Sequence, residues 1–97
     1  MEKETLISIQ QLCEHYNMEF SFIHSLHEYG LLEILTVETT QFIPVEKIKD
    51  IEKMMRMHYE LDINLEGIDT ITHLLNRIEN MQNELTILRN RLSRLED

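Results

Sequence analysis

The feature that most constrains this chain is a heptad repeat of apolar residues in its last third. Between positions 71 and 95, apolar side chains recur at alternating intervals of three and four residues without a miss. This spacing predicts one long helix with a continuous apolar seam, which is typical of a coiled coil. The predicted seam residues are Ile71, Leu74, Ile78, Met81, Leu85, Leu88, Leu92 and Leu95.

Such a helix projects well beyond a domain formed by the rest of a 97-residue chain. A second helix is therefore a better partner for the seam than the chain's own domain, and we expect a homodimer. A parallel dimer pairs Glu84 with Arg89, whereas an antiparallel dimer displaced by a heptad pairs Glu84 with Arg91. Exposed ion pairs contribute about 0.2–1 kcal/mol each, so the polarity of the dimer stays open.

The residues before the seam predict a small helical head. Ser8 followed by Gln11 is typical of a capping box, and apolar residues recur at helical spacing over Ile9–Tyr16. A second helix is expected near Glu19–Tyr29, with Ile23 and Leu26 facing inward. Gly30 suits its left-handed C-terminal cap, and Leu31 suits the apolar contact that follows.

A hairpin and a third helix complete the predicted head. Apolar residues at 34–37 and 42–43 flank a polar turn at 38–40, and Pro44 suits the start of a helix. The apolar stripe of that helix consists of Val45, Ile48, Ile51, Met55 and Tyr59. Asn64 is the expected N-cap of the long helix. The helix is expected to pack on the head through Ile68, Ile71, Leu74 and Leu75. We divide the chain into a head, 1–64, and a helical dimerisation segment, 65–97.

Charge is distributed unevenly along the chain, whose formal net charge is −9. No Lys or Arg occurs between Glu4 and Glu46, although proteins gain affinity for DNA by placing these residues against phosphates. The acidic stretch is either a solvated surface or a docking face for a basic partner. The later basic residues are Lys47, Lys49, Lys53, Arg56, Arg77, Arg89, Arg91 and Arg94.

Several function classes lack support in the sequence. A lone cysteine, Cys13, cannot form an internal disulfide, which suits a reducing cytoplasm. No apolar run approaches the roughly 20 residues that cross a bilayer. His24 and His27 lie one helical turn apart, but zinc sites need three or four ligands and nothing nearby completes the set. We therefore expect no metal, no cofactor and no enzyme activity.

The predicted order of elements resembles that of MerR-type winged-helix proteins. The resemblance centres on Gly30-Leu31-Leu32, which MerR regulators carry directly after an arginine-rich recognition helix. Registered on this tripeptide, the basic positions of that helix fall at about Ser21 and His24. The arginine of the wing falls at about Gln41, beside the aromatic Phe42. The resemblance implies a mainly helical fold, a MerR-like winged helix-turn-helix with a small hairpin wing, from which the usual phosphate contacts are missing.

The segment HYELDINLEGIDTITHLLNRI, residues 58–78, resembles the corresponding stretch of the CbpM chaperone modulators, a MerR-like branch. In both, a Glu-Leu pair (Glu60-Leu61), a short break and a Gly-Ile pair (Gly67-Ile68) precede a long helix. The closing stretch Leu88–Arg94 is also similar. The resemblance implies that the chain binds the J domain of a CbpA-type, DnaJ-like co-chaperone. Covering the basic helix of that domain would inhibit its stimulation of a DnaK-type chaperone.

Positions that a MerR head turns toward DNA are expected to face outward and contact the partner. These positions are Ser21, Phe22, His24, Ser25 and Glu28, with Glu14, Glu19, Glu33 and Glu38 as charge partners. Phe22 is either a partly exposed interface anchor or, with Phe20, part of a wider core stripe. Two other functions stay open: a DNA-binding MerR regulator that uses the basic residues at 47–56, and a coiled-coil adaptor.

Overall fold

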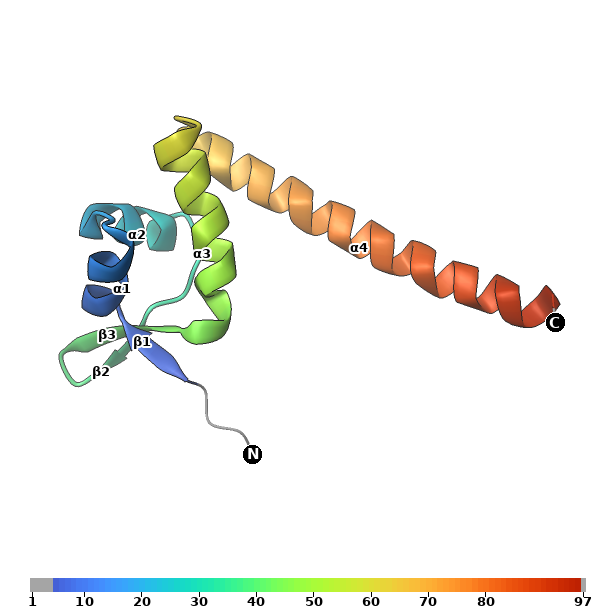
Figure 1. The fold of residues 1–97 in the computed structure, drawn as a ribbon, viewed down its shortest axis with the longest axis horizontal. Helices are drawn as coiled ribbons and strands as arrows, with labels where there is room; N and C mark the ends of the chain where they lie inside the picture. Colours follow the sequence, from blue (N-terminus) through green and yellow to red (C-terminus); the bar gives the residue numbers. More distant parts are fainter. Residues whose placement is uncertain (1–4, 97) are drawn as a thin grey trace.

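The computed structural model describes residues 5–96, which form an N-terminal head and one long helix projecting from it (Figure 1). The head contains three strands, β1 (Leu6–Ser8), β2 (Leu35–Val37) and β3 (Thr40–Pro44). Its helices are α1 (Ile9–Tyr16), α2 (Phe20–Glu28), the 3-10 turn η1 (Val45–Lys47), α3 (Ile48–Met55) and the π-helical turn η2 (Arg56–Glu60). The projecting helix is α4 (Leu65–Glu96). The predicted fold class, a mainly helical winged helix-turn-helix with a long C-terminal helix, is confirmed.

Local sequence signals set the ends of both helices of the helix-turn-helix. The Ser8 hydroxyl accepts the backbone N–H of Gln11 at 3.1 Å and caps α1. Asn17 ends this helix in the left-handed region, with φ 53°. Gly30 does the same after α2, with φ 74°, and glycine adopts this conformation at little steric cost. The predicted helices are confirmed, with α2 one residue shorter at each end than expected.

The sheet has three antiparallel strands in the order β1-β3-β2. Strands β2 and β3 form the predicted hairpin, whose turn contains Glu38 at φ 60°. Strand β1 pairs with the other edge of β3, with Ile7 opposite Ile43. The sequence did not predict β1, because three residues are too few to show a period of two. Pro44 ends β3, and the helical turns begin at the next residue.

The core lies between α1, α2, α3 and the sheet. Its fully buried side chains are Ile9, Leu12, Ile23, Leu26, Ile43, Ile51 and Ile68. The predicted stripe of the third helix is partly wrong, because Val45 and Tyr59 are 39% and 46% exposed. Met54 and Met57 are buried instead. The 3-10 turn before α3 and the wider π-helical turn after it change the angular spacing of residues, which rotates both ends of the stripe away from the core.

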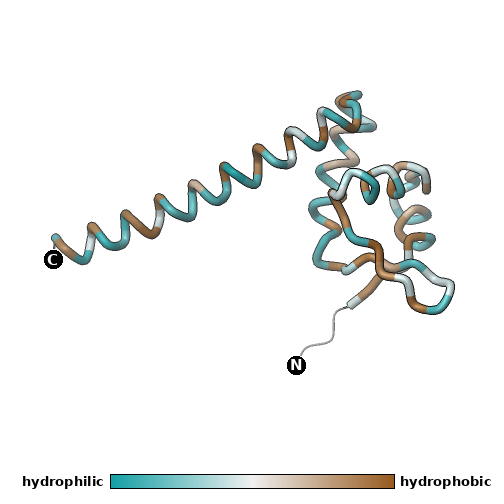
Figure 2. Tube along the Cα trace, turned by 180° about the vertical axis from the view of Figure 1, so that it is seen from behind, coloured by the Kyte–Doolittle hydropathy of each residue, from teal (hydrophilic) through white to brown (hydrophobic). Residues whose placement is uncertain are grey.

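Helix α4 leaves the head after about two turns. Ile68 is fully buried and Ile71 is half-buried, whereas Leu74 and Leu75 are 49% and 43% exposed in the single chain. The prediction that all four pack on the head is therefore wrong for the last two. Apolar and polar segments alternate along the rest of the helix (Figure 2). The remaining seam residues, Ile78, Met81, Leu85, Leu88, Leu92 and Leu95, are exposed.

Hydrogen bonds connect α4 to the head at the start of the helix. Asn64 Oδ1 accepts the backbone N–H of Gly67 at 2.8 Å, which confirms the predicted N-cap. The Tyr29 hydroxyl, at the end of α2, donates to the Glu66 carboxylate at 2.8 Å. The backbone N–H of Glu66 and then this hydroxyl lower the pKa of the Glu66 carboxyl. The junction thus joins α2 directly to the first turn of α4.

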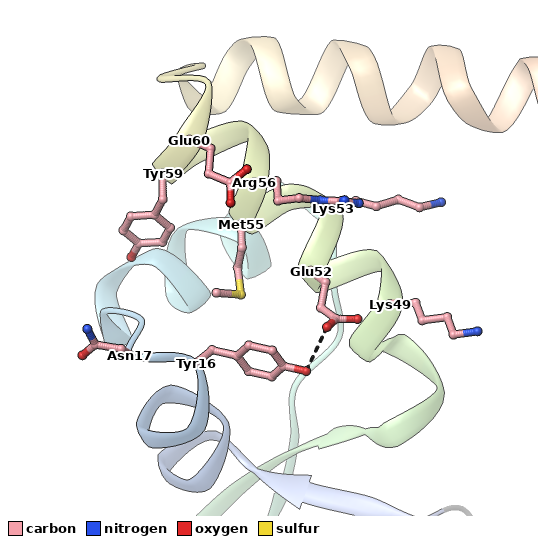
Figure 3. Close-up of a pocket in the computed structure, with 9 residues that line it drawn as sticks. All are labelled: Tyr16, Asn17, Lys49, Glu52, Lys53, Met55, Arg56, Tyr59 and Glu60. Atoms are coloured by element: carbon pink, nitrogen blue, oxygen red, sulfur yellow. Dashed lines mark hydrogen bonds between the residues drawn. The ribbon is translucent and has the colours of Figure 1, made fainter.

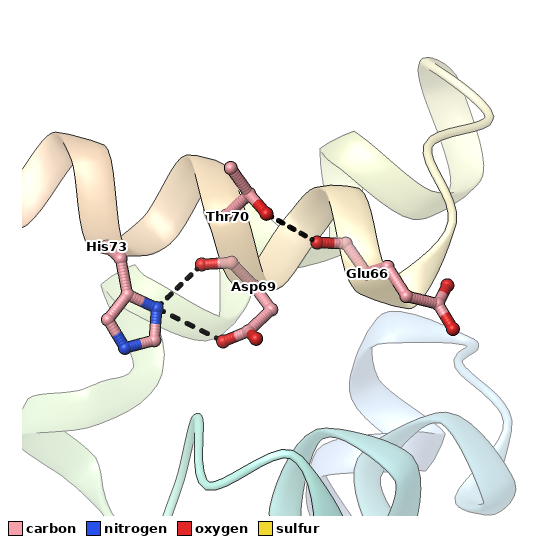
Figure 4. Close-up of polar contacts among 4 residues, drawn as sticks. All are labelled: Glu66, Asp69, Thr70 and His73. Carbon is pink, nitrogen blue, oxygen red and sulfur yellow. Dashed lines mark hydrogen bonds and ion pairs between the residues drawn. The ribbon is translucent and has the colours of Figure 1, made fainter.

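The next turn of α4 is held by side chains that bond within the helix (Figure 4). The Thr70 hydroxyl donates to the carbonyl oxygen of Glu66 at 3.0 Å. His73 Nδ1 lies 2.8 Å from the carbonyl oxygen of Asp69 and 3.1 Å from its carboxylate. Because a carbonyl oxygen can only accept, Nδ1 carries the proton.

Candidate functional site

The outward face of α2 is defined by the residues that it does not bury. Phe22, Ile23 and Leu26 point into the core. Among the predicted contact residues of this helix, Ser21 and Glu28 are exposed, and His24 and Ser25 are half-buried. The outward face is therefore completed by residues at both ends of the helix, Phe20 and His27.

Phe22 does not belong to this face, and the expectation of a partly exposed anchor there is wrong. Its side chain is 4% exposed. The ring stacks on His58 of η2 at a centroid distance of 4.5 Å and meets the edge of Tyr59 at 5.4 Å. The sequence feature that indicates burial of Phe22 is its i, i+4 spacing with Leu26, which places both residues on the core stripe.

The exposed aromatic residue of α2 is Phe20. Its side chain is 50% exposed, and its ring packs on that of His24 at a centroid distance of 4.6 Å. The sequence did not identify Phe20 as a surface anchor, because Phe20 stands three residues before Ile23. This spacing also predicts a residue that faces the core. Only the way in which α2 packs decides between the two phenylalanines.

The predicted acidic residues are all exposed, but they come from different elements. Glu14 lies on α1, Glu19 precedes α2, Glu28 ends it, Glu33 lies in the following loop and Glu38 lies in the wing turn. Among the predicted contact residues that the structure describes, one pair is hydrogen bonded: the Ser21 hydroxyl donates to Glu19 at 3.4 Å. The carboxylates therefore spread over the head instead of meeting at one point.

This surface keeps its negative charge. Between Thr5 and Glu46 the described chain carries no Lys or Arg. Within residues 5–96, the single ion pair joins His73 to Asp69 on α4. We define the α2–wing face as the outward residues of α2, the flanking Glu19 and Glu33, and the wing, which is β2 and β3 with Glu38 in their turn. This part of the head carries the exposed carboxylates of Glu19, Glu28, Glu33 and Glu38 and no Lys or Arg, so its formal charge is negative.

The histidines and the cysteine have separate contacts. His27 Nδ1 donates to the carbonyl oxygen of Leu32 at 3.1 Å, while His24 packs on Phe20. Within residues 5–96, no group of three His, Cys, Asp or Glu side chains could hold a metal ion. Burial raises the pKa of the Cys13 thiol.

None of the helices in the described part of the chain has the length and apolar character to cross a membrane.

A groove of about 700 Å³ opens on another part of the head, between α1, α3 and η2 (Figure 3). It is lined by Tyr16, Asn17, Lys49, Glu52, Lys53, Met55, Arg56, Tyr59 and Glu60. The Tyr16 hydroxyl donates to Glu52 at 3.1 Å across it. We call it the α1–α3 groove. The sequence did not predict it, because its walls come from residues more than thirty positions apart.

The family model of the MerR HTH family regulatory proteins matches residues 7–90. This chain belongs to that family. The match runs from β1 into the last turns of α4, so the MerR HTH assignment covers the head, the wing and most of the projecting helix. A search of curated proteins found no match. The MerR part of the predicted resemblance is thus confirmed. Neither α2 nor the wing of this chain carries a Lys or Arg.

Proposed function

We propose that this MerR-family regulator acts by binding a protein and not DNA. It is a chaperone modulator that covers the basic helical face of the J domain of a CbpA-type, DnaJ-like co-chaperone. Occupying that face prevents the J domain from stimulating its DnaK-type chaperone. The resemblance of residues 58–78 to the CbpM family supports this choice of partner.

The charge of the α2–wing face is the observation that carries the proposal. A DNA-binding head gains affinity by releasing counterions from phosphates, and this requires Lys and Arg on the contacting surface. Here the equivalent surface has exposed carboxylates and no Lys or Arg between Thr5 and Glu46. It repels phosphates and attracts a basic protein surface, and such complementarity speeds association and selects the partner.

The outward face of α2 also offers an apolar anchor. Phe20 is half exposed and rests on His24, with Ser21 beside it. Aromatic residues at the centre of an interface commonly supply much of the binding free energy. An aromatic side chain flanked by Glu19 and Glu28 suits a basic amphipathic helix, whose apolar stripe would cover Phe20 while its cations contact the carboxylates.

The proposal includes a homodimer in the cytoplasm. The seam of α4 supports the dimer, because apolar side chains that are 47–82% exposed continue along it from Leu74 to Leu95. Monomeric soluble proteins rarely expose a continuous apolar surface of this length. A dimer would carry two heads, each with its own α2–wing face.

Titration calorimetry with a purified J domain from a DnaJ-like co-chaperone tests the proposal. Binding is expected at low salt and should weaken as salt rises. Phe20→Ala and Glu28→Lys should each weaken it about tenfold, and both should relieve inhibition of J-domain-stimulated ATP hydrolysis. Glu79→Lys, which makes the same charge change on exposed α4, is the control. No binding to the J domain, or equal losses with the control, would refute the proposal.

A DNA-binding regulator is the second candidate, and membership of the MerR HTH family favours it. The cations of the described head that could contact phosphates lie on η1, α3 and η2 and are Lys47, Lys49, Lys53 and Arg56. A gel shift with duplex DNA at moderate salt tests this reading. Sequence-dependent binding that Lys49→Glu abolishes would establish it in place of the J-domain proposal.

A further inference from the structure

The α1–α3 groove has a stripe of cations, none of which forms an ion pair within residues 5–96. Lys49, Lys53 and Arg56 follow one another at intervals of four and three residues, which places them on one side of α3 and η2. In Figure 3 the side chains of Lys49 and Lys53 extend toward the same side. Like charges four residues apart destabilise a helix, and none of the three forms an ion pair within residues 5–96. No ion pair within the described residues offsets the repulsion between Lys49 and Lys53, although Glu52 and Glu60 each stand four residues from Arg56.

The floor of the groove is apolar and aromatic. Met55 is half-buried and points toward Tyr16, while Tyr59 stands on the opposite wall at 46% exposure (Figure 3). Met54 and Met57 supply the buried core contacts of this helix. Met55 packs against the edge of the core and Tyr59 meets the Phe22 ring edge-on, so both keep part of their surface open to the groove. Their exposure creates an apolar surface beside the cations.

A hydrogen bond fixes the geometry of the floor. The Tyr16 hydroxyl donates to Glu52 at 3.1 Å. Burial and then this bond to the Glu52 carboxylate raise the pKa of Tyr16, so the phenol stays protonated and keeps its role as donor. Glu52 is thus occupied by the phenol and does not pair with Lys49, Lys53 or Arg56 within the described chain.

We propose that the α1–α3 groove is a docking site for a short acidic peptide segment of another protein. The carboxylates of the peptide contact Lys49, Lys53 and Arg56, and the guanidinium of the arginine can hold a carboxylate through two parallel hydrogen bonds. A bulky apolar side chain of the peptide inserts against Tyr16 and Met55. The volume of about 700 Å³ lies in the range of roughly 300–1,000 Å³ that binding pockets occupy.

The lining favours a peptide over a nucleic acid. Glu52 and Glu60 stand in the same groove as the three cations, so phosphates that recur at every nucleotide would meet like charge, whereas a peptide can place its carboxylates beside the cations alone. A peptide has backbone N–H groups that can donate to the Glu60 carboxylate. The described lining contains no residue of α2, β2 or β3, and the groove borders the α2–wing face where the Tyr59 hydroxyl accepts the backbone N–H of Glu19 at 3.1 Å.

Tryptophan fluorescence gives a direct test, because the chain contains no Trp. The probe is a capped synthetic peptide in which one tryptophan stands between two pairs of acidic residues. The expected result is a saturable blue shift of the probe's emission that weakens with salt. A peptide with lysines in place of the acidic residues should not bind.

Variants locate the site. Lys53→Glu with Arg56→Glu should weaken the probe about tenfold or more, and Met55→Ala should weaken it without changing the charge. Arg89→Glu with Arg94→Glu makes the same charge change far along α4 and should leave binding unchanged. Circular dichroism checks that each variant is folded. Equal losses with the α4 variant, or no binding of the probe, would overturn the proposal. So would tighter binding of duplex DNA that Lys53→Glu with Arg56→Glu abolishes.

Discussion

Leu85→Glu together with Leu88→Glu should separate the proposed dimer into folded monomers. The two leucines are 47% and 57% exposed in the single chain, so about half of each side chain remains to be buried by a second helix. Full burial of a leucine contributes about 1.5–3 kcal/mol, which gives about 1 kcal/mol for each half-buried residue. Two leucines in each of two chains therefore contribute about 4 kcal/mol, and their loss raises the dissociation constant roughly 1,000-fold. Desolvation of the introduced carboxylates adds to this loss.

Sedimentation velocity over a range of concentrations measures the effect. The matched control is Ile87→Glu, since Ile87 is 52% exposed and lies on α4 between the two leucines but outside the heptad seam. The control should keep the mass of the dimer, and far-ultraviolet circular dichroism should show similar helix content in both proteins. A double variant with an unchanged mass would refute the assignment of the seam. A monomeric Ile87→Glu protein would show that exposure alone, and not heptad position, explains the result.

Three further predictions concern the head. Phe22→Ala should lower the free energy of unfolding by about 3–5 kcal/mol, because the ring is 4% exposed, whereas Phe20→Ala should change it by under about 1 kcal/mol; urea denaturation compares the two. Gly30→Ala should cost about 1–2 kcal/mol in the same assay through its φ of 74° alone, since nothing lies within 4 Å of the added methyl group. Tyr29→Phe should raise the pKa of Glu66 only part of the way to its ordinary value, because the hydrogen bond from the backbone N–H of Glu66 remains; an NMR titration of its carboxyl carbon follows this. Because the pKa of Glu66 is lowered in the folded state, this carboxylate stabilises the fold above its unfolded pKa. The stabilisation is lost as the pH falls through the folded pKa. The Tyr29→Phe protein should therefore lose less stability on acidification than the unsubstituted protein.

The helix ends were predictable because the groups that fix them are neighbours in sequence. The side chain of Ser8 caps α1 by accepting a backbone N–H only three residues later, and Asn64 does the same for α4. Gly30 needs no distant partner to adopt a left-handed conformation. The position of each helix therefore follows from short-range chemistry. Strand β1 was missed for the opposite reason, since its three residues form a strand only by pairing with β3, more than thirty positions later in the chain.

The candidate site was predictable in its charge but not in its shape. The lack of Lys and Arg between Glu4 and Glu46 is visible in the sequence, and exposure of the glutamates follows from the cost of burying a charge. Whether Phe20 or Phe22 faces outward depends on how α2 is rotated against α3 and η2, where His58 covers the second ring. The α1–α3 groove likewise needs α1 and α3 to be placed side by side.

The sequence by itself determined the helices, their caps, the apolar seam of α4 and the sign of the charge on the head. Each of these depends on residues within a few positions of one another, or on composition alone. The tertiary structure decided which aromatic ring is buried, which side of α3 is left uncovered, and that α4 leaves the head after Ile71. Those outcomes depend on the angles at which helices pack, because a helix can turn either side of a broad apolar stripe toward the core. The contacts that select one rotation, such as Phe22 with His58 and Tyr29 with Glu66, join residues that are far apart in the chain.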